Sequence, residues 1–192
     1  GDNQTLLKEA LQTADRADVI VAALGECSEM SGESASRTTL EIPDAQRDLL
    51  KALVKTGKPV VLLLFTGRPL VLTEEAVNIP SILNVWFAGS EAGLAIADVL
   101  FGDQNPSGKL TTTFPRSVGQ IPIYYASKNT GRPLGNQNGK LEKFKSNYID
   151  ERNEPLFPFG FELSYTNFDY SKIESNSKTL NNTNSISFSV NV

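Results

Sequence analysis

The stretch PVVLLLF at residues 59–65 is apolar without interruption after its proline and has the length of one β-strand. Two more short apolar runs, ADVIVAAL at 17–24 and SILNVW at 81–86, lie on either side of it in the sequence. Such nearly continuous apolar runs are typical of strands that are buried on both faces of a parallel sheet. The sequence therefore predicts three buried, parallel strands.

Segments with helical spacing of apolar residues alternate with these runs. We predict helices over residues 3–15, 43–55, 73–77 and 90–100. Ser90 fits the N-cap of the last helix, and Gly102 fits its C-terminal end. Alternating strands and helices predict an α/β fold, a layered sandwich with a mostly parallel sheet and helices on both faces.

The character of the sequence changes after about residue 105, where turn-forming residues become frequent and an exposed loop is expected at 131–139. Residues 171–192 are rich in Ser, Asn and Thr. The final segment SISFSVNV, 185–192, alternates polar and apolar residues, which predicts a half-buried antiparallel strand. This tail is interpreted as the start of an all-β module.

The composition excludes several classes of function. A net charge of −4 and a pI of about 5.0 argue against a nucleic-acid-binding protein. The absence of histidine rules out a Ser-His-Asp triad, a Cys-His pair and a His-ligated metal within this chain. The single cysteine, Cys27, excludes an internal disulfide and a cysteine zinc cluster. No apolar run is long enough to cross a membrane. We expect no metal, cofactor, nucleic acid or membrane partner.

The loop Gly25–Arg37, GECSEMSGESASR, follows the first predicted strand and carries three carboxylates, Glu26, Glu29 and Glu33. In open α/β sheets ligands bind beyond the carboxyl ends of the strands, so this is where chemistry is expected. The alternative is an ordinary solvated acidic loop. Trp86 is similarly open to two interpretations, a core residue at a strand end or a platform beside a ligand.

Two turn residues, Arg68 and Lys109, are interpreted as structural ion-pair partners rather than as ligand contacts.

Five segments share their order and spacing with one known family: ADVIVAALGE (17–26), LEIPDAQRDLLKAL (40–53), GKPVVLLLFTGRPL (57–70), NVWFAGSEAGLAIADVLFGDQNPSGKLTTTFP (84–115) and LFPFGFELSYTNF (156–168). Together they resemble the C-terminal α/β sandwich domain of glycoside hydrolase family three, in particular the bacterial periplasmic β-glucosidase type. The resemblance implies that residues 1–163 form this domain, shortened at its N-terminal side. It also implies that 164–192 begin an incomplete fibronectin-III-like β-sandwich.

The resemblance also implies a divided active site. The family's nucleophile is an aspartate on a barrel domain, which is absent from this chain. Its general acid/base is a glutamate on a loop of the sandwich domain that reaches over the barrel mouth. The pattern E-G-x-D-R matches Glu33 and Arg37, with Ser36 in place of the aspartate, and the pattern G-E matches Glu26. The candidates for the acid/base are therefore Glu33 first, Glu26 second and Glu29 third, with Arg37 and Trp86 as substrate-binding candidates.

The implied function is that of a fragment of a retaining β-glycosidase, a β-glucosidase that removes terminal β-D-glucosyl residues. This chemistry needs two carboxyl groups about 5–5.5 Å apart and no histidine. The implied substrates are oligosaccharides or aryl and alkyl β-glucosides, the implied partner is the barrel domain of the same parent chain, and the implied location is the bacterial periplasm or exterior. The alternatives are a carbohydrate-binding domain without catalysis and a scaffold domain that supports the barrel.

Overall fold

A computed structural model describes residues 2–133 and 143–192 of the chain and places a parallel sheet at its centre. The strands β1 (Ile20–Gly25), β2 (Val60–Phe65) and β3 (Ser81–Asn84) lie side by side in the order β1-β2-β3. The register pairs Ile20 with Val60, and Val61 with Ser81. The three predicted strands and the α/β fold class are confirmed. β1 begins later than expected and β3 ends at Asn84 rather than at residue 86.

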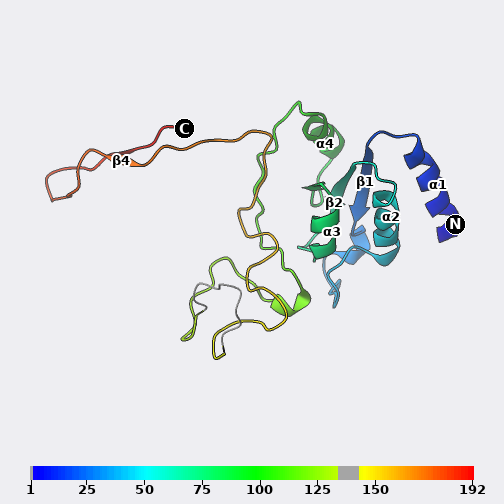
Figure 1. Cartoon of the computed structure of the whole chain (residues 1–192), viewed down its shortest axis with the longest axis horizontal. Helices are drawn as coiled ribbons and strands as arrows, with labels where there is room; N and C mark the ends of the chain where they lie inside the picture. Colours follow the sequence, from blue (N-terminus) through cyan, green and yellow to red (C-terminus); the bar gives the residue numbers. More distant parts are fainter. Residues whose placement is uncertain (1, 134–142) are drawn as a thin grey trace.

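The core forms where helices cover one face of the central strand. Alternate residues Val60, Leu62 and Leu64 of β2 are at most 2% exposed. Helix α2 (Asp44–Val54) contributes Leu50 and Leu53 to the same cluster. Helix α1 (Asn3–Asp15) contacts α2 and supplies one buried alanine. The sheet and these helices appear together in Figure 1.

Two further helices follow the second and third strands. Helix α3 spans Thr73–Asn78 and helix α4 spans Ala92–Phe101. Gly102 adopts a left-handed φ of 85° and ends α4, as the sequence predicted. The predicted cap at Ser90 is wrong, because α4 begins later and its N-cap residue, Glu91, makes no capping hydrogen bond with its side chain.

Part of the apolar surface in the described residues is uncovered. Val21, on the opposite face of β1 from the core, is 50% exposed. No residue of α4 is buried, although the helix is apolar on nearly every side, and Leu94 and Phe101 are 69% and 84% exposed. A helix that is apolar all round is normally covered by other protein. The sheet is therefore well packed on one side and open on part of the other.

Two segments that are far apart in the sequence, 110–114 and 157–161, pair with each other. Phe114 and Phe157 form an antiparallel bridge, and the amide of Leu110 donates to the carbonyl of Phe161 at 2.9 Å. Lys109 forms an ion pair with Glu162, as expected for a structural partner. Most of the loop expected at 131–139 lies outside the described residues.

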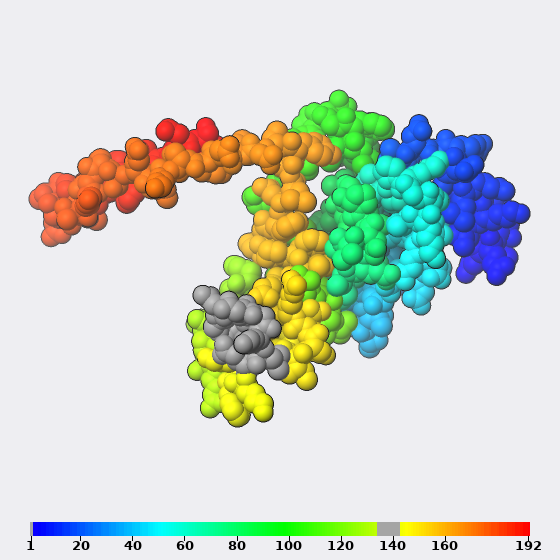
Figure 2. All heavy atoms as spheres, in the orientation of Figure 1, coloured from blue at the N-terminus to red at the C-terminus, as the bar shows by residue number. Residues whose placement is uncertain are grey.

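The C-terminal residues form a thin extension from the body (Figure 2). Only two short antiparallel strands occur there, β4 (Glu174–Ser175) and β5 (Phe188–Ser189). The antiparallel strand expected in 185–192 is confirmed at Phe188–Ser189, but its expected half-burial is wrong, since Phe188 is 69% exposed. No second sheet packs against this hairpin in the described part of the chain, so its apolar residues have nothing to bury against. A fibronectin-III-like module stays a prediction.

We expect side-chain truncations on the two faces of the sheet to lower the free energy of unfolding by different amounts. Leu64→Ala removes a fully buried side chain and should lower the free energy of unfolding by about 2–5 kcal/mol. Val21→Ala, on the open face, should change it by about 0.5 kcal/mol or less. Urea unfolding followed by circular dichroism measures both. Equal losses would contradict the one-sided core.

Candidate functional site

The carboxyl ends of the three strands meet at one edge of the sheet, because all three run parallel. Glu26 follows β1, Thr66 follows β2, and Trp86 lies two residues beyond β3. Residues 26–42 connect β1 to α2 and begin at this edge. The topology therefore brings the predicted acidic loop to the expected place.

Glu26 begins the loop as a buried carboxylate, and its side chain has 0% exposure. Its Oε1 accepts a hydrogen bond from Arg37 at 2.7 Å and lies 3.2 Å from Nε of Arg68. Its Oε2 accepts from the Thr66 hydroxyl at 2.9 Å and from the Gly67 amide at 3.2 Å. Both carboxylate oxygens are thus engaged, one mainly by guanidinium groups and one by the turn after β2.

These contacts determine the protonation of Glu26. Burial by itself raises the pKa of the Glu26 carboxyl, but the hydrogen bonds from Arg37, Thr66 and Gly67, with the charge of Arg68, lower the pKa below its ordinary value. Glu26 is therefore held as the ionised carboxylate at neutral pH. A group of this kind is a strong anchor and a poor proton donor.

The backbone at the end of β1 can be formed only by glycine. Gly25 has a φ of 144°, and a Cβ at this position would lie 1.8 Å from the carbonyl oxygen of Phe65. The side chain of Gln46, from α2, accepts from the Gly25 amide at 2.7 Å and donates to its carbonyl at 3.0 Å. The residue that presents Glu26 is thus fixed by a neighbouring strand and a helix.

The other two carboxylates of the loop are exposed. Glu29 lies in a 3₁₀ turn, Ser28–Met30, where hydrogen bonds from its own backbone amide and then from the side chains of Cys27 and Ser28 lower its pKa. Glu33 lies between Gly32, with a φ of 111°, and Ser34, with a φ of 61°. Within the described residues, Glu33 makes no hydrogen bond or ion pair. Its carboxylate is the one of the three that no protein group engages there.

The two predicted substrate-binding residues are both partly buried. Arg37 donates to Glu26 and to the backbone carbonyl of Glu41 at 3.0 Å, so its guanidinium is already paired. The ring of Trp86 lies 5.8 Å from that of Phe114, between centroids, and packs against the core. Trp86 also has a left-handed φ of 56°, which costs a non-glycine residue roughly 1–2 kcal/mol. Substrate contact by either residue stays a prediction.

Sequence reasoning missed how much the TGR turn at 66–68 contributes to the site. Arg68 was expected to form a structural ion pair and does so with Glu26, but its NH2 group also donates to the carbonyls of Met30 and Ala35. The available signal was position, since TGR directly follows the central strand at the edge where the loop begins. Spacing along the chain gives no indication of which side chains pair across that edge.

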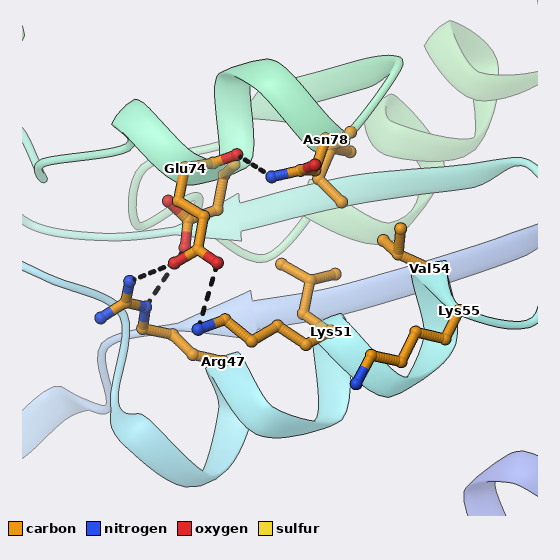
Figure 3. A pocket seen from close by; sticks show the side chains of 9 residues that line it. Arg47, Lys51, Val54, Lys55, Glu74 and Asn78 are labelled. Carbon is orange, nitrogen blue, oxygen red and sulfur yellow. Dashed lines mark hydrogen bonds and ion pairs between the residues drawn. The ribbon is translucent and has the colours of Figure 1, made fainter.

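A separate hollow of about 290 Å³ lies between α2 and α3 (Figure 3). Three of its charged groups pair with one another: Arg47 lies 2.7 Å from Glu74, and Lys51 lies 3.1 Å from the same carboxylate. Glu74 has a lowered pKa, mainly because of its hydrogen bond from Lys51. This network joins the two helices.

Other kinds of site are not apparent in the described ranges. Residues 2–133 and 143–192 contain no group of three or more acidic or cysteine side chains placed to hold a metal ion. Within the same ranges, no helix combines the length and apolarity needed to cross a membrane. The chemistry of the edge is therefore argued from its carboxylates and arginines.

Comparison with known proteins gives one consistent family. The model of the glycosyl hydrolase family 3 C-terminal domain matches residues 2–165. The chain is 53% identical to a periplasmic beta-glucosidase of Salmonella typhimurium over 98% of this chain and 24% of that protein. It is 43% identical to a beta-xylosidase of Formosa agariphila, over 95% of this chain and 24% of that one.

Solved structures agree. A beta-glucosidase from Listeria innocua matches with a TM-score of 0.80 and 42% identity, over 88% of this chain and 23% of that chain. That enzyme has also been solved in complex with glucose. The chain thus spans about a quarter of the length of the relatives it matches.

We expect Glu26→Gln to destabilise the chain in a pH-dependent way. Removing one member of a buried ion pair typically costs about 3–5 kcal/mol, because it leaves Arg37 and Arg68 without their carboxylate. Since the folded-state pKa of Glu26 is lowered, its stabilisation is present above its unfolded pKa, about 4.3, and is lost as the pH falls through the folded value. Urea unfolding should therefore show a large difference at pH 7 that narrows below about pH 4.

Glu33→Gln is the matched control for this measurement, because it makes the same chemical change at an exposed position of the same loop. It should change the free energy of unfolding by about 0.5 kcal/mol or less at either pH. A Glu26→Gln penalty that did not depend on pH would mean that the carboxylate charge contributes little.

Proposed function

The chain belongs to the family of glycosyl hydrolase family 3 C-terminal domains, and on this premise we propose that its Gly25–Arg37 loop supplies the general acid/base of a retaining β-glucosidase. The nucleophile is then an aspartate of a barrel domain elsewhere in the whole protein. The substrates are oligosaccharides or aryl and alkyl β-glucosides. A periplasmic or secreted location is supported by the name of the Salmonella relative.

The single observation that carries this proposal is the contrast between Glu33 and Glu26. Glu26 is buried, ionised and fully engaged, whereas Glu33 is exposed and unengaged among the described residues, at the turn of the same loop. A proton donor needs a carboxyl group that is free to reach the glycosidic oxygen. Glu33 is therefore proposed as the acid/base.

The proposed division of labour fits the physical needs of the reaction. In a retaining mechanism one carboxylate attacks the sugar while the other gives and later takes a proton. The donor needs a raised pKa, which enclosure in a water-poor site provides. Glu33 has no such enclosure among the residues that the structure describes, so the surface that covers it is assigned to the barrel. Arg37 and Trp86 are the proposed substrate-binding residues at the same edge of the sheet.

A scaffold or carbohydrate-binding role is the second candidate. The uncovered apolar surface at Val21, Leu94 and Phe101 favours it, because such surface suits a domain that packs against a neighbour. This role and the catalytic one differ in whether a loop carboxylate transfers a proton.

We predict that Glu33→Gln in the whole protein lowers kcat/KM by about 10²–10⁴-fold for cellobiose, whose leaving group needs protonation. The loss should be much smaller for dinitrophenyl glucoside, which departs without it. Added azide should partly restore turnover of the activated substrate, since it attacks the glycosyl-enzyme without help from a base. Steady-state kinetics on the two substrates measure this pattern.

Glu29→Gln is the matched control and should show neither the leaving-group dependence nor the azide rescue. If the pattern appeared at Glu26 instead, the loop would keep its role and the choice of residue would be wrong. If no loop glutamate showed it, the scaffold role would be favoured.

The isolated 192-residue chain is predicted to be inactive on aryl β-glucosides. It holds at most one of the two carboxyl groups that the reaction needs. Release of nitrophenol by the purified chain, followed at high enzyme concentration, measures this. Turnover that co-purified with the chain and vanished in Glu33→Gln would contradict the proposed division of the site.

A further inference from the structure

The NH2 group of Arg68 reaches across to the loop that bears Glu33. It donates to the carbonyl oxygen of Met30 and, at 2.9 Å, to that of Ala35. These two residues stand on either side of the turn 31–34. One guanidinium nitrogen therefore bridges the two ends of the turn that carries the proposed acid/base.

From this bridge we infer that Arg68 is a positioning residue for the proton transfer: it closes the turn so that Glu33 is presented in one orientation. The inference rests on the proposed function of Glu33. Arg68 does not touch the reacting atoms in this account, and its action passes through the backbone of Met30 and Ala35.

The turn has little else to hold it in shape. Its own backbone hydrogen bond, from the Ala35 amide to the Gly32 carbonyl, is 3.3 Å long, beyond the usual range. Gly32 and Ser34 both adopt positive φ, which is unfavourable for serine. No residue from 31 to 36 is buried. Apolar packing therefore does not fix this turn, and the two bonds from Arg68 are its main external restraints.

Arg68 can restrain the turn because it is itself held. Its Nε lies 3.2 Å from Oε1 of Glu26, and its backbone amide donates to the Thr66 hydroxyl at 3.2 Å. Glu26 is in turn fixed at the end of β1. The contacts thus run from the central sheet through Glu26 and its ion pair with Arg68 to the turn.

Gly67 provides an independent contact with the same turn. A Cβ at this position would lie 2.0 Å from Oγ of Ser31 and 2.8 Å from the ring of Phe87. The turn thus lies directly against the backbone of residue 67, and any side chain there would push Ser31 outward. Arg68 and Gly67 therefore both set the position of this turn. Arg68 donates hydrogen bonds to it, and Gly67 has no side chain in the space that Ser31 occupies.

The chemistry of the bridge requires arginine. A guanidinium presents several N–H donors in a rigid, planar fork, so it can hold the carboxylate and both carbonyls together. Lysine keeps the positive charge, but its ammonium nitrogen ends one bond short of the NH2 position and cannot lie beside the carboxylate and between the two carbonyls at the same time. Arg68→Lys therefore removes the bridge while preserving the charge beside Glu26.

The test is leaving-group dependence in the whole protein, measured for Arg68→Lys beside Glu33→Gln and a control, Arg47→Lys. Arg47 is a close match, since its side chain is 20% exposed against 21% for Arg68 and it also pairs with carboxylates. Its partners are Glu74 and Glu75 of α3 and Glu41 just before α2, and Figure 3 shows the pair with Glu74. Both arginine variants should lose some thermal stability.

We expect Arg68→Lys to lower kcat/KM for cellobiose by about 10–100-fold, the scale on which misplacement of a reacting group by about 1 Å acts. The loss for dinitrophenyl glucoside should be clearly smaller, with partial azide rescue. Arg47→Lys should affect the two substrates equally, because it alters only stability. Gly67→Ala, which keeps Arg68 but displaces Ser31, should reproduce the selective loss, and it serves if Arg68→Lys does not fold.

Three outcomes overturn the inference. If Arg68→Lys treats the two substrates alike while Glu33→Gln discriminates between them, Arg68 is only structural and the proposed function stands. If Arg68→Lys does not fold and Gly67→Ala shows no discrimination, the inference fails in the same way. If Glu33→Gln itself does not discriminate, the proposed function fails and the positioning role falls with it.

Discussion

The buried carboxylate of Glu26 is the interaction on which the edge of this domain depends. An ionised carboxylate without exposure is tolerated only if its oxygens are paired. Here two arginines, a hydroxyl and a backbone amide meet that requirement. Because Arg37 comes from the far end of the loop and the other three groups come from the turn after β2, satisfying one charge also joins segments that are distant in sequence. The pairing of Glu26 therefore stabilises the buried charge and also fixes the position of the loop relative to the turn after β2.

Anchoring and proton transfer place opposite demands on a carboxyl group, and the proposed function assigns them to different residues of the loop. Glu26 is ionised by its partners, which suits an anchor. Glu33 is left exposed within the described part of the chain, so its environment in a complete site depends on what covers it. A general acid works best when its pKa is near the working pH. A domain that spans about a quarter of its relatives' length can thus hold the carboxylate in place while leaving the tuning of its pKa to another surface.

The sequence predicts most of the layered core, because burial leaves a direct pattern in it. The apolar runs at 17–24, 59–65 and 81–86 correspond to the three parallel strands. The apolar pattern does not predict features that depend on contacts between segments distant in the sequence. The alternation in 185–192 predicted a half-buried strand, yet among the described residues no second sheet packs against Phe188, which is exposed. Likewise, residues 26 and 68 are paired across the sheet edge, and no spacing rule connects them.

Two arginines of similar exposure show why the surroundings of an ion pair determine its role. Arg47 links α2 to α3, whose places are already fixed by buried Leu50, Leu53 and Ile79. Its ion pairs add stability to an arrangement that apolar packing would maintain. Arg68 instead binds two carbonyls in a loop segment with no buried residue between them. Where apolar packing is absent, polar contacts determine the geometry of a segment. An arginine that would add only a little stability between two helices can then determine the orientation of a nearby side chain, which is the role proposed for Arg68 toward Glu33.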